Sequence, residues 1–182
     1  MGKERDVIFY DTIFKSSEAY SLETSGYDCR YAEVYNKSLA NLTKDDIILE
    51  LGCGTGQLAE MIVKGGFNYL QGIDFSPEAL KIAKQRVSAD FFLCDLNLYR
   101  FYSDYNTIIA TEVFEHIIND LEIIARIKKG TKVIFSVPTF NNAAHVRFFE
   151  TPETVIERYG SLFEDYTVIT IDKIFLFVGI KK

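Results

Sequence analysis

The chain has 182 residues, of which 48% are hydrophobic and 25% are charged, and its formal net charge is -6. This length is enough for one domain with its own core, and the composition excludes a disordered protein. The acidic balance disfavours proteins that coat nucleic acid or anionic membranes through bulk positive charge. We therefore expect a single domain over residues 1–182, in which residues 1–26 are a candidate lid segment or pack on the fold.

The three cysteines, Cys29, Cys53 and Cys94, are too few and too scattered for a disulfide framework or a zinc site. They are typical of free thiols in a reducing compartment. The N-terminus lacks the apolar run of a signal peptide, and no stretch approaches the roughly 18 apolar residues of a membrane span. These features predict a cytoplasmic protein.

The first predicted element is a helix over residues 31–42, where apolar residues recur at the spacing of one helix face. A strand over residues 47–49 follows and leads into a glycine-rich turn. The helix after that turn has three apolar residues on its inner face, Leu58, Met61 and Ile62. We expect the glycine pair at 65–66 to end this helix.

A second strand near residues 69–73 ends at Asp74. The tripeptide Ser-Pro-Glu at 76–78 then predicts the start of a helix, because it offers a hydroxyl cap, a proline at the first helical position and an acid in the first turn. Short apolar runs predict a third strand over 91–93 and a fourth over 107–110.

The next helix is expected to place Ile117, Leu121 and Ile124 on one buried face. A fifth strand is predicted over residues 133–137, and the tripeptide Thr-Pro-Glu at 151–153 predicts the start of another helix.

The last two predicted strands, 166–171 and 174–180, are separated by only about two residues. A parallel crossover needs about a dozen residues, so these strands must form an antiparallel hairpin. Short strands alternate with helices along the rest of the chain, which is typical of an α/β protein. The sequence predicts a Rossmann-like, mostly parallel seven-stranded sheet with helices on both faces and an antiparallel C-terminal hairpin.

The strongest functional signal is the segment Glu-Leu-Gly-Cys-Gly-Thr-Gly at residues 50–56, between a predicted strand and a predicted helix. Glycines there let the backbone turn tightly and approach a ligand closely. Asp74 follows at the end of the second strand, where a carboxylate can accept hydrogen bonds from ribose hydroxyls. A nicotinamide-dinucleotide loop would have its third glycine where Gln57 stands, so this loop is adapted to another ligand.

This set of motifs resembles the class I S-adenosylmethionine (SAM)-dependent methyltransferases, whose first motif is an acid followed by G-x-G-x-G. The stretch GIDFSPEAL at 72–80 is similar to their second motif, and CDL at 94–96 to their adenine-contacting segment. TEVFEHI at 111–117 is similar to the segment after the fourth strand in the ubiquinone-type group. The resemblance covers nearly the whole chain, and it implies a single methyltransferase domain with SAM as cofactor.

The resemblance also implies roles for the residues of the glycine loop. Gly52, Gly54 and Gly56 would face the methionine part of SAM, with Cys53 between them. Glu50 would anchor the loop or reach the amino group of the cofactor.

The ribose and adenine of SAM would be held by the two segments that follow. Asp74 would hold the ribose, with Ser76 in the same cofactor-binding segment. Phe75 and Leu96 would sandwich the adenine, and Asp95 would accept a hydrogen bond from its exocyclic amine.

Two further residues complete the implied cofactor site. Glu112 would line its floor near the sulfonium. Arg30, in the helix expected to close over the cofactor, would pair with the methionine carboxylate, although a solvated helix charge is an equal alternative.

Methyl transfer from SAM requires alignment of the acceptor and, where needed, removal of a proton. The candidate bases are the only two histidines, His116 and His145, which follow the fourth and fifth strands at the ligand-binding end of the sheet. With Glu115 they form the predicted catalytic group. The segment 139–150 around His145 has no regular period, which is typical of a binding loop. Purely structural roles remain the alternative for both histidines.

The pattern formed by Glu112, Glu115 and His116, with His145 further on, also resembles the metal-binding set of the small-RNA 3′-terminal 2′-O-methyltransferases. These four side chains could hold a divalent ion that activates a ribose hydroxyl. The same pattern is familiar in small-molecule methyltransferases that bind no metal there, and the longer histidine motif of the RNA enzymes is not reproduced. We therefore expect no bound metal.

We expect a SAM-dependent methyltransferase that acts on a hydroxyl or amine of a small or medium-sized acceptor. The alternatives are methylation of an RNA 3′-terminal ribose or a protein terminus, and a catalytically silent SAM-binding partner subunit. We expect no membrane partner and a small-molecule acceptor in preference to a nucleic acid, which stays an alternative, while the oligomeric state stays open. The aromatic residues of the N-terminal segment either pack on the fold or form a lid, and acceptor specificity can come only from this segment and the loop 139–150.

Overall fold

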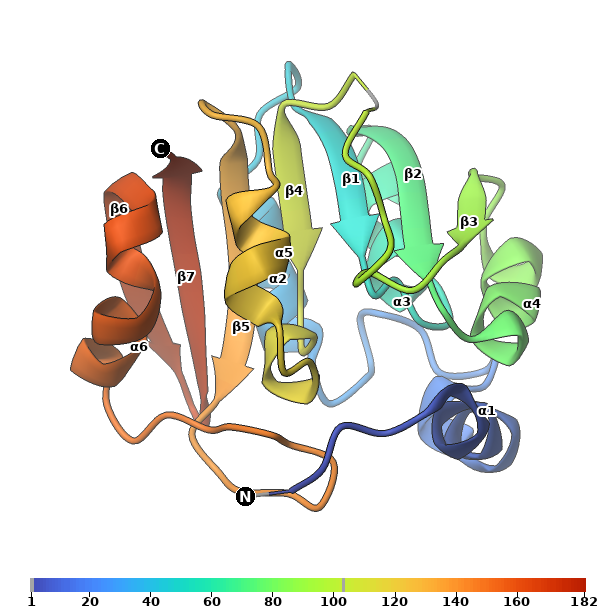
Figure 1. The fold of residues 1–182 in the computed structure, drawn as a ribbon. Coiled ribbons are helices and arrows are strands. Elements are labelled where there is room, and N and C mark those ends of the chain that lie inside the picture. The colour runs from blue at the N-terminus through green and yellow to red at the C-terminus, as the bar shows by residue number, and fades with distance from the viewer. Residues whose placement is uncertain (1, 103) are drawn as a thin grey trace.

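The computed structural model describes residues 2–102 and 104–182. They form a seven-stranded sheet in the order β3-β2-β1-β4-β5-β7-β6, which confirms the predicted fold class (Figure 1). The pairs among β1 to β5 are parallel, whereas β7 runs antiparallel to both of its neighbours. The strands are β1 (Ile47–Leu51), β2 (Asn68–Asp74), β3 (Phe91–Leu93), β4 (Thr107–Ala110), β5 (Lys132–Pro138), β6 (Phe163–Ile171) and β7 (Ile174–Lys181).

Helices cover both faces of this sheet. In Figure 1, α5 and α6 lie in front of the sheet and α2 and α3 behind it, with α4 beside the β3 edge. The helices are α1 (Val7–Ser16), α2 (Ala32–Ala40), α3 (Gln57–Lys64), α4 (Pro77–Arg86), α5 (Asp120–Ala125) and α6 (Pro152–Tyr159). Three short 3-10 turns connect them, η1 (Glu18–Tyr20), η2 (Phe114–His116) and η3 (Gly160–Leu162). In the described part of the chain, no helix has the length and apolar character needed to cross a membrane.

The core is divided by the sheet into two clusters, and β1 contributes to both. Leu49 and Leu51 pack in the cluster that contains the buried residues of α5 and α6. Ile48 points to the opposite face and packs with Val34 of α2 and Leu58 of α3. Side chains alternate along a strand, so a central strand between two helical layers must be apolar on both sides.

The helix starts follow the predicted capping signals. Ser76 Oγ accepts a hydrogen bond from Ala79 N at 3.0 Å and caps α4, with proline in the first turn. Thr151 and Thr154 form a capping box at the start of α6. Each cap satisfies an N–H group that has no partner within its helix.

The helix after β4 differs from the prediction. α5 begins only at Asp120, so Ile117 lies before it, and Leu121 is 36% exposed. Ile123 and Ile124 form the inner face together with the fully buried Asp120. The prediction therefore holds for Ile124, which is fully buried, and for Ile117, which packs partly buried on the core, but it is wrong for Leu121. A buried carboxylate that binds cations of neighbouring segments is invisible to a pattern of apolar residues.

The strand bounds also extend beyond the predicted ones. β1 continues to Leu51, β2 includes Asp74, and β6 begins at Phe163, three residues earlier than expected. α2 is shorter than predicted and ends at Ala40. Sequence periodicity locates the centre of an element better than its ends.

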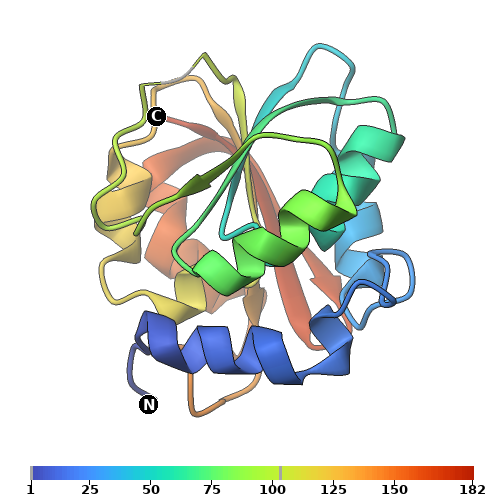
Figure 2. The same cartoon turned by 90° about the vertical axis from the view of Figure 1, so that its right-hand side faces the viewer.

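The sequence pattern did not identify α1 as a helix. Asp6 caps it, accepting a hydrogen bond from Phe9 N at 3.0 Å. None of its residues is buried, because α1 packs on the rest of the protein through one side only. Figures 1 and 2 show α1 crossing the carboxyl ends of the parallel strands, where α/β sheets bind their ligands.

Candidate active site

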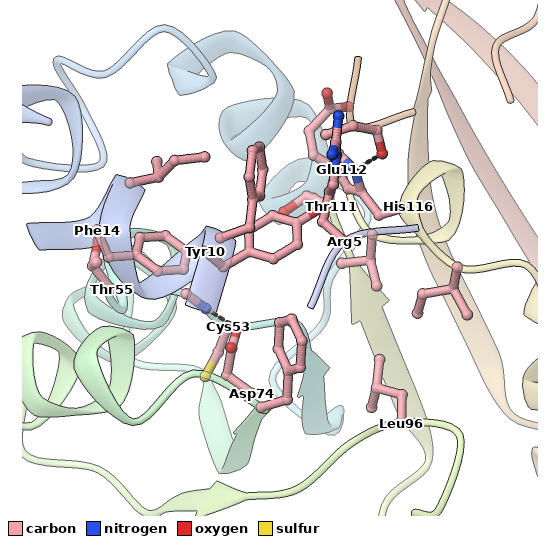
Figure 3. A pocket seen from close by; sticks show the side chains of 18 of the residues that line it. Arg5, Tyr10, Phe14, Cys53, Thr55, Asp74, Leu96, Thr111, Glu112 and His116 are labelled. Carbon is pink, nitrogen blue, oxygen red and sulfur yellow. Dashed lines mark hydrogen bonds between the residues drawn. The ribbon is translucent and has the colours of Figure 1, made fainter. Parts of the chain in front are cut away.

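A cavity of about 660 Å³ lies between α1 and the carboxyl ends of the strands. This volume lies within the range of about 300–1,000 Å³ that is common for small-molecule sites. The glycine loop and the end of β2 line one half of the cavity, and η2 with the loop 139–150 lines the other. In Figure 3, Cys53 and Asp74 lie on one side, Glu112 and His116 on the other, and Tyr10 of α1 between them.

The glycine loop has a backbone that only glycine adopts easily. Gly52, Gly54 and Gly56 have φ values of 64°, 51° and 76°, in the left-handed region. A Cβ at Gly52 would lie 2.5 Å from Val113 Cγ2, so the loop and the segment after β4 pack directly against each other. Gly56 also begins α3 as its N-cap.

Asp74 connects the loop to β2. Its carboxylate is 6% exposed and accepts hydrogen bonds from Gly54 N at 2.8 Å and from Ser76 N at 2.9 Å. Burial nevertheless raises the pKa of Asp74 above its usual value, and the bonds to these N–H groups oppose that rise. One carboxylate therefore both shapes the loop and faces the cavity.

Glu50 is buried beneath the loop, where it accepts a hydrogen bond from the Tyr69 hydroxyl at 2.6 Å. Burial raises the pKa of Glu50 to about 8, because this single hydroxyl and no cation lies against it. This contact ties the end of β1 to β2, and Glu50 also lines the cavity.

The remaining predicted cofactor residues lie around the same half of the cavity. Asp95 accepts a hydrogen bond from Asn97 N at 2.8 Å. Arg30 stands in a turn just before α2, not in the helix as predicted; it donates to the Tyr20 hydroxyl at 2.8 Å and stacks over Tyr31. The predicted residues that line the cavity are Arg30, Glu50, Gly52, Cys53, Gly54, Asp74, Phe75, Asp95, Leu96, Glu112, His116 and His145.

Three predicted site residues, Gly56, Ser76 and Glu115, do not line the cavity. The Ser76 hydroxyl is used in capping α4 and in donating a hydrogen bond to Asp11 of α1. Gly56 faces Ala83 of α4. Glu115 is fully buried behind His116 and Glu112.

Glu115, His116 and His145 form a compact group that we name the histidine corner. The two imidazole rings pack edge to face with centroids 5.0 Å apart, and Val146 N donates to the Glu115 carbonyl at 2.8 Å. His145 is only 5% exposed, so the structure does not support the surface-loop alternative for it. Burial lowers the pKa of both histidines, which keeps them neutral near pH 7.

Backbone carbonyls fix the tautomers of both histidines. His116 Nδ1 lies 3.0 Å from the Ala144 carbonyl, and His145 Nδ1 lies 3.1 Å from the Phe140 carbonyl. A carbonyl oxygen can only accept, so each Nδ1 carries the proton and each Nε2 presents a lone pair.

Glu115 has no hydrogen-bond partner at either carboxylate oxygen. His116 Nε2 lies 3.5 Å from Glu115 Oε1, and one ligand atom from each member of the histidine corner lies within 4.8 Å of the others. Burial raises the pKa of Glu115 to about 8. The lone pairs of Glu115, His116 and His145 point toward one another, and no hydrogen-bond donor lies between them. Such a group can bind either a shared proton or a cation.

The N-terminal segment closes the cavity through contacts with both of its halves. On the histidine side, Gly2 N donates to the His145 carbonyl at 2.9 Å, and an Arg5 N–H donates to the Ala143 carbonyl at 3.1 Å. On the cofactor side, Lys15 pairs with Glu78 of α4 at 3.2 Å.

Sequence reasoning missed Ser136 and Arg147. Ser136 is a fully buried hydroxyl within the otherwise apolar run 133–137 of β5, and it donates a hydrogen bond to Glu112 at 2.8 Å. Arg147 donates to the carbonyls of Phe114 and Ile117 and so ties the loop 139–150 to η2. A single hydroxyl within the apolar run 133–137 could have indicated Ser136 from the sequence, whereas the partners of Arg147 depend on tertiary structure.

Residues 48–133 match the family described as methyltransferase domain. The chain is 33% identical over 93 residues to trans-aconitate 2-methyltransferase of Rhizobium rhizogenes, which covers 50% of this chain and 36% of the relative. It is 31% identical over 138 residues to malonyl-[acyl-carrier protein] O-methyltransferase of Bacillus cereus, covering 68% of this chain and 51% of the relative. The chain thus spans about half or less of the length of these curated relatives.

The fold is shared with solved methyltransferases. The N-methyltransferase NodS from Bradyrhizobium japonicum, in complex with S-adenosylhomocysteine (SAH), superposes with a TM-score of 0.72. The two sequences are 16% identical, and the match covers 97% of this chain and 99% of that one. At this identity the likeness concerns the fold alone.

Proposed function

Because the chain belongs to the class I SAM-dependent methyltransferases, we propose that it transfers the SAM methyl group to a hydroxyl or amine of a small acceptor held beside His145. The observation that carries this proposal is the single cavity that joins the glycine loop to the histidine corner. A donor on one half and an acceptor on the other would meet without solvent between them.

The glycine-loop half fits the cofactor. The left-handed glycines bring backbone within reach of a ligand, and Asp74 presents a carboxylate at the end of β2 where ribose hydroxyls need an acceptor. Phe75 and Leu96 supply apolar surface for the adenine ring, and Asp95 supplies an oxygen for its amine. These roles are extended to this chain from the family.

The histidine half fits the acceptor. His145 is neutral, with its Nδ1–H held by a carbonyl and its Nε2 free to take a proton. In the transfer, the acceptor oxygen or nitrogen forms a bond to the methyl carbon while the carbon–sulfur bond breaks. The electron pair of that bond stays on sulfur, and the proton of the acceptor passes to His145.

Closure by α1 supports a small acceptor. Phe9, Tyr10 and Phe14 of this helix line the cavity, so the bound molecule would be covered by the N-terminal segment. We extend the predicted lid role of residues 1–26 to this position. Binding of a folded macromolecule would require that cover to open.

A second candidate is metal-assisted methylation of a ribose hydroxyl at an RNA 3′ end. Glu115 and the two histidines fit a divalent ion: each Nδ1 donates to a carbonyl, as metal-binding histidines commonly do, and the buried Glu115 lacks any donor. Ligands about 2.1 Å from a tetrahedral ion lie about 3.4 Å apart, close to the 3.5 Å between His116 and Glu115. Such an ion would lower the pKa of an acceptor hydroxyl.

One experiment tests both candidates. The protein is incubated with methyl-labelled SAM and fractionated cell extract, with and without EDTA. Label in low-mass material that persists in EDTA supports the first candidate, whereas label in RNA that EDTA abolishes and added Mn²⁺ or Zn²⁺ restores supports the second. No transfer to any fraction would favour the silent partner subunit and contradict both. The cytoplasmic location and the ubiquinone-type subgroup remain predictions.

A further inference from the structure

Glu112 has an unusual backbone for its residue type. Its φ is 55°, in the left-handed region, which is strained for an L side chain. Asp165 and Asp172 share this conformation, but they lie in the bulge of β6 and in the β6–β7 turn, where the path of the chain requires it. Glu112 follows β4 at the cavity wall. Residues with a strained backbone are common at functional sites.

A buried serine locks the Glu112 side chain. Glu112 N donates to Ser136 Oγ at 2.9 Å, and the same hydroxyl donates to Glu112 Oε1 at 2.8 Å. The carboxylate is therefore folded back over its own backbone and cannot swing away from the cavity. Ser136 is fully buried in β5, which makes this lock rigid.

Glu112 stands where the two halves of the cavity meet. The next residue, Val113, packs on Gly52 of the glycine loop, while His116 belongs to the histidine corner. Figure 3 places Glu112 beside Thr111 and His116, across the cavity from Asp74. A methyl group that passes from donor to acceptor must cross this junction.

The carboxyl group of Glu112 forms no direct ion pair. None of the ion pairs among the described residues includes Glu112. Arg30 is engaged with Tyr20 and Tyr31. Burial, followed by the neighbouring Glu115, raises the pKa of Glu112 to about 8, while the hydrogen bond from Ser136 and the charges of His116 and Arg30 oppose that rise. This group is therefore a carboxylate above about pH 8, and a positive charge placed beside it would favour the same charged form at lower pH. A locked carboxylate that lines a cavity without a counter-ion is a site for a positive charge.

We propose that Glu112, locked by Ser136, makes the site discriminate by charge between SAM and its demethylated product SAH. SAM carries a positive sulfur, and transfer of the methyl group leaves its bonding electron pair on sulfur, which becomes a neutral thioether. The attraction to Glu112 is then lost, so the product is held less tightly relative to the donor than it would be without this carboxylate. This inference rests on the proposed function.

The test is a cycle of two proteins and two ligands, measured by titration calorimetry in EDTA at about pH 9, above the raised pKa of Glu112. SAM and SAH are each titrated into the wild type and Glu112→Gln, and the ratio Kd(SAH)/Kd(SAM) is compared. We expect this ratio to fall about tenfold in Glu112→Gln, because a charge pair at a partly buried site contributes on that scale. Ser136→Ala, which frees the carboxylate, should lower the ratio by about threefold. Glu122→Gln removes an exposed glutamate of α5 and should leave it unchanged.

The outcomes separate this inference from the proposed function. If the wild type binds neither ligand, the proposed function fails. If both ligands bind and the ratio is the same in Glu112→Gln as in the wild type, the discrimination by Glu112 is refuted. Should Glu112→Gln fail to fold by circular dichroism, Ser136→Ala decides, and an unchanged ratio in that variant would count against the inference.

Discussion

The two halves of the cavity are built in different ways. The glycine-loop half comes from consecutive segments, in which β1, the glycine loop, α3 and β2 follow one another, and its shape depends mainly on the backbone of three left-handed glycines. The histidine half combines three segments that are far apart in sequence: α1, η2 and the loop 139–150. A contiguous site can be predicted from local spacing, whereas an assembled one depends on contacts such as that of Gly2 with His145.

The largest expected effect tests the histidine half. His145→Ala should lower kcat by about 10²–10⁴-fold, because the acceptor loses its proton-accepting group, while SAM affinity stays nearly unchanged. Initial rates with the acceptor identified by the label screen check this. Asn141→Ala, an exposed neighbour in the same loop, is the matched control. A silent His145→Ala would mean that alignment alone suffices, as for an amine that is already nucleophilic.

SAM affinity should be just as sensitive to changes in the backbone of the glycine-loop half. Gly52→Ala adds a Cβ 2.5 Å from Val113 at a φ of 64°, so we expect SAM affinity to fall by about 100-fold or more. Gly130→Ala is the control, because Gly130 has a φ of 82° with nothing within 4 Å of its added Cβ. That variant should lose about 1 kcal/mol of stability and bind SAM normally. If both variants bind SAM with equal affinity, the claim that the glycine loop contacts the cofactor is contradicted.

The two halves of the cavity also differ in how much of each could be predicted from the sequence. The glycine loop and Asp74 could be placed in advance, because left-handed glycines and a strand-end acid leave a local pattern. His116 and His145 were proposed as one group from strand ends alone, and the structure brings them to 5.0 Å. The roles of Ser136 and Arg147 could not be predicted, because their hydrogen-bond partners come from other elements. α5 was misplaced because its inner face includes the charged Asp120.

A smaller effect is expected at α1, whose residues line the cavity. Asp11→Ala removes the acceptor of the Ser76 hydroxyl between α1 and α4, and a hydrogen bond of about 1 kcal/mol corresponds to roughly fivefold faster SAH dissociation. Surface plasmon resonance measures this rate. Thr12→Ala should not change it, because the Thr12 hydroxyl bonds only to Ile8 of its own helix. An unchanged rate of SAH dissociation in Asp11→Ala would contradict the claim that α1 retains the cofactor in the cavity.

The smallest expected effect concerns the pH dependence of stability. The pKa of Glu50 is raised by burial to about 8, so between about pH 4.5 and pH 8 the native state holds a proton that the unfolded state has released. Stability from this group therefore falls as the pH rises through that window. Glu50→Gln keeps an acceptor for Tyr69 and should raise Tm by about 2–4 °C at pH 8.5, with little change at pH 4.5.

Thermal scans of both proteins at the two pH values check this prediction. Glu157→Gln, an exposed position on α6, should show no such difference. A Tm gain of Glu50→Gln that is equal at both pH values would show that the carboxylate of Glu50 is not disfavoured by burial.

The central claim, that the glycine-loop half binds SAM through Asp74, is tested most directly by titrating SAM into the wild type and Asp74→Ala. We expect one site in the wild type and affinity about 10- to 100-fold weaker in Asp74→Ala, because two ribose hydroxyls lose a charged acceptor. Asp45→Ala, at an exposed position before β1, should bind as the wild type does. NAD(H) should not bind comparably. Unchanged SAM affinity in a folded Asp74→Ala, or tight NAD(H) binding by the wild type, would contradict the account.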